Sequence, residues 1–210
     1  MNYLALIGDI CGSRGVADRG ELQHALHSVL EELNGAHAKA LASPITVTLG
    51  DEFQALLTSA KPIWEMVAVI QASLYPVRMR FGFGVGTIAT DINPEAALGM
   101  DGPAFHHARD AMTVLKEEGG LFFIKGVSGT KLANHSLRLI SELQSQWQHN
   151  RFKVYRFYLE GRPVQQIVES LSISKTAVYK NINDGLLETF HGIQSAISEQ
   201  LEEQLEEQLR

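Results

Sequence analysis

The pattern of apolar and polar residues divides the first 130 positions into short strands and longer helices. Residues 3–7 are largely apolar and precede a Gly-Asp pair, which predicts a buried strand that ends in a turn. Leucine and valine then recur at helical spacing, which predicts a helix over 18–42, capped by Asp18 and ended by Pro44. The later predicted elements are strands at 45–49 and 53–57, a helix at 60–73, a strand or hairpin at 77–88, a helix from Pro103 to about 118, and a strand at 121–127.

The order of these elements predicts the fold class. Strand–helix–strand–strand–helix–strand is the order of a ferredoxin-like core, an antiparallel sheet with helices on one face. We therefore expect an α+β domain over 1–133. In such a sheet the first strand and the hairpin can be neighbours, so Asp9 and Asp51 would lie close together.

From residue 134 onward the pattern is helical. It predicts a connecting helix over 134–150, a three-helix unit over 151–190 and an acidic helix over 191–210. The last segment has an apolar stripe with a drifting four-residue spacing. We expect a solvated or dimerising helix rather than a membrane-bound one, because its polar face is acidic.

The three-helix unit has the pattern of a helix-turn-helix, with helices at 153–159, 164–171 and 175–187. Ser174 follows a short turn and is a good N-cap for the third helix. The run from Gly161 to Val178 resembles helix-turn-helix domains of the sigma-factor type, which implies DNA as a partner. The outward residues expected to contact DNA are Lys175, Thr176, Tyr179 and Lys180. The alternative is a three-helix packing module that binds no DNA.

The charge of this segment favours the DNA-binding helix-turn-helix over the packing module. The chain has a net charge of −6, yet residues 151–190 hold six basic and four acidic side chains. This excess is small, so one copy would bind DNA weakly and a homodimer is expected. Cys11, the single cysteine, excludes an internal disulfide and a cysteine-based zinc cluster. The apolar runs are too short to span a bilayer, and we expect a cytoplasmic protein with no membrane partner.

Two acidic turns are the candidates for chemistry. Asp9 follows the first strand, and Asp51 lies in the turn of the predicted hairpin. Carboxylates at neighbouring strand ends can hold Mg²⁺ or Mn²⁺, and the cation can hold the phosphates of a nucleotide. The alternative is that both are ordinary turn residues.

The residues around these turns resemble two groups of enzymes. Residues 9–13, Asp-Ile-Cys-Gly-Ser, resemble the motif that opens class III nucleotidyl cyclase domains. Residues 49–53, Leu-Gly-Asp-Glu-Phe, resemble the second metal-binding hairpin of those domains and the Gly-Gly-Asp-Glu-Phe hairpin of diguanylate cyclases. The glycine-rich stretch 80–86 and the segment 102–109 follow in the cyclase order.

The cyclase resemblance implies a role for each matching position. Asp9 and Asp51 would ligate the metal, and Arg109 would stabilise the transition state. His106, three residues before Arg109, would replace the cyclase asparagine, whose own position holds Phe105. The backbone expected to bind phosphate is that of Ile10, Cys11, Gly12 and Ser13.

Two further positions depart from the cyclase patterns. Val47 stands where the cyclases place a base-selecting lysine, and Leu49 replaces the first glycine of the diguanylate motif. The residues therefore favour metal–triphosphate binding over cyclisation and leave the base open.

The whole chain also resembles the SatD family of bacterial proteins, through residues 5–10, 48–54 and 99–106. That resemblance implies no particular activity. The combined expectation is a DNA-binding transcriptional regulator with a Mg²⁺–nucleotide sensor domain. The alternatives are an active metal-dependent nucleotidyl cyclase or phosphotransferase, and a degenerate cyclase fold that serves as a dimerisation scaffold.

Overall fold

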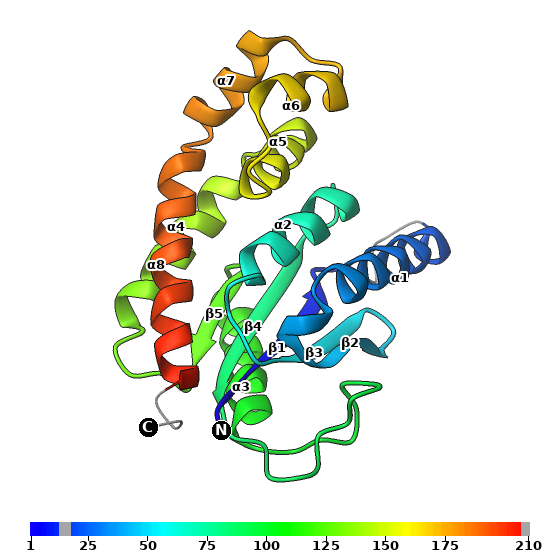
Figure 1. Ribbon diagram of the computed structural model, residues 1–210, viewed down its shortest axis with the longest axis vertical. Helices are drawn as coiled ribbons and strands as arrows, with labels where there is room; N and C mark the ends of the chain where they lie inside the picture. Colours follow the sequence, from blue (N-terminus) through cyan, green and yellow to red (C-terminus); the bar gives the residue numbers. More distant parts are fainter. Residues whose placement is uncertain (13–17, 207–210) are drawn as a thin grey trace.

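The computed structural model describes residues 1–12 and 18–206, and within them it contains one mixed sheet (Figure 1). The strand order is β2-β3-β1-β4-β5. Central β1 is antiparallel to β3 and β4, β2 is antiparallel to β3, and β5 is parallel to β4. The strands are β1 (Tyr3–Ile10), β2 (Leu41–Leu49), β3 (Glu52–Leu57), β4 (Met79–Gly86) and β5 (Phe122–Lys125). The first four have the ferredoxin-like order, and parallel β5 makes the sheet mixed.

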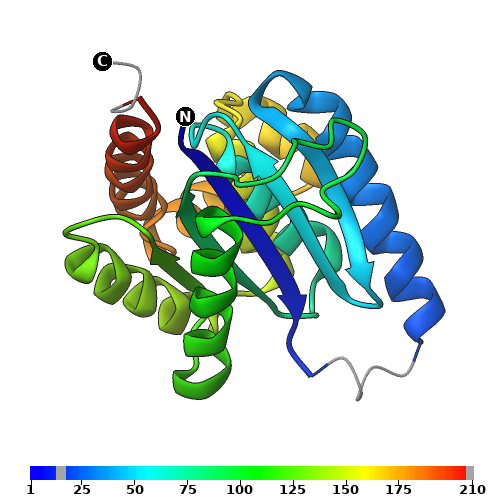
Figure 2. The same ribbon diagram turned by 90° about the horizontal axis from the view of Figure 1, so that it is seen from below.

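Helices cover both faces of the sheet. The helices α1 (Arg19–Ala36) and α2 (Ile63–Leu74) pack on one face of the sheet. The helix α3 (Pro103–Glu118) packs on the opposite face. Figure 2 shows α3 in front of the sheet. The expectation of helices on one face is therefore wrong. Residues 4–7 of β1 are buried on both sides, so each face needs an apolar cover.

The first helix is shorter than its sequence predicts. α1 ends at Ala36, a short 3₁₀ helix η2 (Ala38–Ala40) follows, and Pro44 lies inside β2 rather than after a helix. β2 is an edge strand whose pairing with β3 shifts register around this proline. An edge strand tolerates proline because fewer of its N–H groups are needed for pairing.

Glycines in β4 set the position of α3. A Cβ atom at Gly84 would lie 2.2 Å from the Ala104 carbonyl oxygen and 2.2 Å from the Ala108 nitrogen. Gly82 and Gly86 face the same helix at similarly short range. Because no side chain separates them, the α3 backbone packs directly on the strand.

The remaining helices rise from the sheet and return to it. They are α4 (Lys131–Gln144), α5 (His149–Leu159), α6 (Val164–Leu171), α7 (Lys175–Asp184) and α8 (Leu187–Glu206). Figure 1 places α6 and α7 at the end far from the sheet, while α8 runs back beside it. Ile197, Leu201 and Leu205 of α8 are buried. The apolar stripe of this acidic helix therefore packs against its own chain, so the expectation of a solvated helix is wrong for this side of α8.

Candidate functional site

Strand pairing brings the two acidic turns to one end of the sheet. Asp9 lies opposite Glu52 of β3 on one side and opposite Arg80 of β4 on the other. Asp51 immediately precedes Glu52 in the β2–β3 turn. The backbones that carry Asp9 and Asp51 are therefore neighbours, although β1 and this turn are far apart in sequence.

Two cations hold the Asp9 carboxylate. Its Oδ2 lies 3.5 Å from Arg80 Nη1 and 3.3 Å from Lys116 Nζ, and the Asp9 side chain is only 13% exposed. Asp51 makes no ion pair or hydrogen bond with its side chain among the residues described. The Asp9 carboxylate is thus neutralised by cations of the same chain, whereas the Asp51 carboxylate has no described cation partner.

Sequence reasoning missed Lys116. It occupies the last turn of α3, a position where a lysine commonly serves only the helix dipole. It reaches Asp9 because α3 runs antiparallel to β4 and so ends beside the carboxyl end of β1. The only signal in the sequence is its place two turns after Arg109 on the same helix face.

The segment expected to bind phosphate is only partly described. Ile10 ends β1, the N–H of Cys11 donates to the Arg78 carbonyl at 2.8 Å, and Gly12 has a φ of 68°. Ser13 lies outside the described residues. Burial raises the pKa of the Cys11 thiol, even though two arginines nearby act to lower it, so the thiol stays protonated at neutral pH.

The expected catalytic residues lie elsewhere on α3. His106 Nε2 lies 2.7 Å from Asp101 Oδ1, at the helix end opposite Lys116. Arg109 is exposed and has no ion-pair partner in the described part of the chain. It sits two helical turns, about 10 Å along the axis, before Lys116. Within one chain the structure therefore does not bring His106 to Asp9.

The α6–α7 pair forms a second candidate site. Ser172 adopts a left-handed conformation with φ of 52°, and Ser174 Oγ accepts from the Ala177 N–H at 3.1 Å. Ile167 of α6 and Val178 of α7 are buried. These features match the predicted turn and cap. All four side chains expected to face outward are exposed: Lys175, Thr176, Tyr179 and Lys180.

The cations on this face are not neutralised within the described chain. Lys175 Nζ lies 6.0 Å from the ring centroid of Tyr179, and neither Lys175 nor Lys180 has a described carboxylate partner. Arg162, by contrast, is paired with Glu160 at 2.5 Å. The exposed face of α7 is therefore available to an external anion.

A divalent metal can be tested against the donor groups present. Residues 1–12 and 18–206 contain no cluster of three or more His, Cys, Asp or Glu placed to hold a metal. Asp51 and Asp9 fit such an ion only if phosphate oxygens supply further ligands, because Asp9 is already shared by two cations. Two carboxylates alone supply too few ligands for a bare divalent ion.

Comparisons with known proteins place the chain in a family. A model of the SatD family matches residues 3–188, and a search of curated proteins gave no match. The solved structures that it resembles include a bacterial light-regulated adenylyl cyclase, with 13% identity and a TM-score of 0.42 over 59% of this chain and 43% of that one. Another is the guanylyl cyclase Cya2, with 16% identity and a TM-score of 0.40 over 59% of this chain and 74% of that one.

Both TM-scores are below 0.5, so these similarities establish neither an activity nor a ligand for this chain. The described helices include none long and apolar enough to cross a membrane. The family match covers most of the sequence, including both candidate sites. The chain therefore belongs to the SatD family.

Proposed function

We propose that this protein is a DNA-binding regulator that places α7 in the major groove of double-stranded DNA. The observation that carries the proposal is the exposed face of α7 behind a capped turn, whose two lysines have no carboxylate partner among the described residues. Lys175 and Lys180 provide cations for phosphates, and Thr176 and Tyr179 provide hydrogen-bonding groups for base edges or phosphates. A regulator of this kind works in the cytoplasm.

A single copy offers few cations, so two copies would share the binding. Helix-turn-helix dimers contact two half-sites about one helical turn apart, and the preferred DNA should then be an inverted or direct repeat. The repeat and its spacing would report the symmetry of the dimer.

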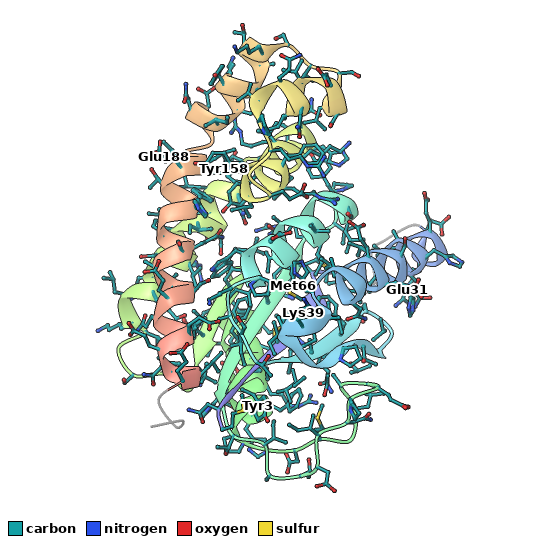
Figure 3. The ribbon with its side chains drawn as sticks, in the orientation of Figure 1. Tyr3, Glu31, Lys39, Met66, Tyr158 and Glu188 are labelled. Carbon is teal, nitrogen blue, oxygen red and sulfur yellow. The ribbon has the colours of Figure 1, made fainter. Side chains whose placement is uncertain are left out.

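The test begins with selection of a preferred sequence from a pool of random duplexes. Affinity for that sequence is then measured as a function of salt for the wild type and for Lys175→Ala/Lys180→Ala. Each lost phosphate contact should lower the slope of log K against log salt by about 0.9. Lys39→Ala/Lys61→Ala removes two exposed lysines outside α7 and should leave the slope unchanged (Lys39 is labelled in Figure 3). Failure to enrich any sequence, or equal losses in both variants, would refute DNA recognition by α7.

A second candidate function is binding of a nucleoside triphosphate with Mg²⁺ at the Asp9 end of the sheet. It is favoured by the two neighbouring carboxylates and two cations there. Asp9 and Asp51 would hold the metal, which supplies charge neutralisation for the phosphates. Arg80 and Lys116 would bind phosphate oxygens, because anionic phosphate competes with Asp9 for both side chains.

Thermal stability with a panel of nucleotides, with and without Mg²⁺, tests this site. A ligand at 100 times its dissociation constant should stabilise the fold by about 2.7 kcal/mol. Asp51→Asn should abolish the Mg²⁺-dependent part without disturbing a described contact, since Asp51 makes none. If no nucleotide stabilises either the wild type or Asp51→Asn, nucleotide binding is refuted. The remaining alternative for this domain is then a dimerisation scaffold.

Turnover assays with the same nucleotides distinguish a nucleotide-sensing regulator from an enzyme. Turnover of a bound triphosphate, lost in Arg109→Ala, would make the protein a nucleotidyl cyclase or phosphotransferase. Binding without turnover, together with a change in DNA affinity when nucleotide and Mg²⁺ are present, would make it a nucleotide-sensing regulator.

A further inference from the structure

Three leucines along one side of α4 point away from the core. Leu132, Leu139 and Leu143 are 77%, 59% and 38% exposed. Their spacing of seven and four residues places them on a single stripe of the helix, and Ser136 lies on the same stripe. A single exposed leucine is ordinary, but a row of them on one helix is an apolar surface of the kind that binds another protein.

A groove of about 300 Å³ lies beside this row, between α4 and α8. Its walls include apolar or small side chains from both helices: Leu132, Ala133, Ser136, Ile193, Ala196 and Ile197. The leucine row and the groove together are called the α4–α8 face below. A ridge of large side chains beside a groove lined by smaller ones lets two copies interlock, because the ridge of each copy can fill the groove of the other. Neither candidate function above uses this face.

The two edges of the α4–α8 face carry charges of opposite sign. Lys131 and His135 lie on the side of α4 away from the groove, and Glu199 and Glu203 lie on the side of α8 away from it. All four side chains are exposed and have no ion-pair partner in residues 1–12 and 18–206. One edge is therefore basic and the other is acidic.

The two edges also meet at the same level along α8. The Gln200 amide donates to the Ser128 carbonyl at 3.3 Å, which holds the start of α4 beside this part of α8. Lys131 is the first residue of α4, and Glu199 precedes Gln200. A partner of complementary charge must therefore present an acidic group and a basic group at one level, as a second copy of this chain does.

We propose that the α4–α8 face is the interface of a homodimer, in which α4 of each copy packs on α8 of the other. A two-fold axis along α8 exchanges the basic and acidic edges, so Lys131 of one copy meets Glu199 and Glu203 of the second copy. A two-fold axis across α8 would place like charges opposite each other. The charges therefore select the axis along α8.

The same axis suits the proposed function, on which this choice of partner rests in part. Figure 1 shows α8 running along the long axis of the molecule, with α6 and α7 at one end. Rotation about an axis along α8 keeps that end of both copies on the same side of the dimer. Both α7 helices could then contact one DNA duplex, whereas an axis across α8 would place them at opposite ends.

Sedimentation equilibrium of the full chain without DNA tests the interface. We expect a dimer at micromolar concentration. Leu132→Asp should weaken dimerisation at least tenfold, and it should preserve the fold because an acidic residue in the first turn favours a helix. Leu98→Asp is the matched control, since Leu98 is also an exposed leucine but lies between β4 and α3. It should change the dissociation constant of the dimer less than twofold.

Charge reversal tests which edges pair. Lys131→Glu and Glu199→Lys/Glu203→Lys should each weaken the homodimer severalfold, because like charges then face each other. An equimolar mixture of the two variants should form a heterodimer with the wild-type affinity, since opposite charges pair again at both edges. Circular dichroism establishes that each variant folds.

Three results would overturn the proposal: a wild type that stays monomeric at high micromolar concentration, equal losses in Leu132→Asp and Leu98→Asp, or a mixture that binds no more tightly than its separate variants. These results are distinct from failure of the proposed function. A monomer that enriches a DNA sequence refutes the interface and leaves DNA recognition intact. A dimer that passes these tests but enriches no sequence refutes DNA recognition and leaves the interface intact.

Discussion

The Asp9 end of the sheet and the exposed face of α7 both carry charged residues, but they use them differently. At the sheet end, Asp9 is neutralised by Arg80 and Lys116 from two other elements. On α7, Lys175 and Lys180 have no described carboxylate partner. A ligand at the sheet end must therefore displace existing ion pairs, whereas an anion can approach α7 at little structural cost.

The two regions also differ in what positions them. The Asp9 cluster depends on long-range packing, because Lys116 arrives only when α3 lies flat on the glycines of β4. The α7 face depends mainly on local structure, namely the Ser174 cap and a left-handed Ser172. Substitutions should consequently affect stability at the sheet end and binding at α7.

The largest stability effect is expected from Gly84→Ala, which should separate α3 from β4. The added methyl group would meet backbone atoms that cannot rotate away, so we expect a loss of about 3 kcal/mol in unfolding free energy. Denaturant unfolding measures this loss. Gly192→Ala, inside α8 with open space around the added methyl, should instead stabilise by up to about 1 kcal/mol. If both substitutions change the unfolding free energy by a similar small amount, the close packing of α3 on β4 is not required for stability.

Tyr155→Phe should have the next largest effect, by loosening the link between α5 and α8. The buried Tyr155 hydroxyl donates to Gln194 Oε1, and its removal leaves a buried acceptor at a cost of about 1–3 kcal/mol. Urea unfolding at neutral pH measures this cost.

The same variant carries a pH signature. Burial raises the pKa of Tyr155 above its ordinary value of about 10, so the folded state keeps a proton that the unfolded state loses. The stabilisation is complete below pH 10 and declines as pH rises above it. Stability should therefore fall less steeply above pH 10 in Tyr155→Phe than in the wild type. Parallel curves would contradict a buried, un-ionised tyrosine.

Asp9→Asn should cost about 1–2 kcal/mol, because it leaves Arg80 and Lys116 without their shared partner in a partly buried setting. Thermal unfolding at low and high salt measures the effect. The difference between the two proteins should persist at high salt, since burial limits screening of the Asp9 pairs. If Asp9→Asn leaves the unfolding free energy unchanged, the charges around Asp9 are already solvated.

The smallest stability effect is expected from Lys175→Ala/Lys180→Ala. Both side chains are exposed and have no ion-pair partner in residues 1–12 and 18–206, so the unfolding free energy should stay within about 0.5 kcal/mol of the wild type. Chemical unfolding of the DNA-free protein provides the measurement. A loss comparable to that of Asp9→Asn would place these lysines in the fold instead of on a free binding surface.

Much of the fold could be predicted from short-range patterns. The β2–β3 hairpin, the start of α3 at Pro103, the span of α6 and the cap of α7 all follow from residues within one or two turns of each element. The proximity of Asp9 and Asp51 followed from element order alone. Pro44 misled the prediction, because a proline can end a helix or lie within an edge strand.

The sequence by itself determined the type and order of most helices and strands and which face of α7 is polar, because backbone propensities, caps and periodicity act over a few residues. Tertiary structure alone decided that Lys116 joins Arg80 at Asp9, that α3 covers the second face of the sheet, and that the stripe of α8 is buried. These contacts join residues far apart in the chain, and no local pattern encodes the packing that brings them together.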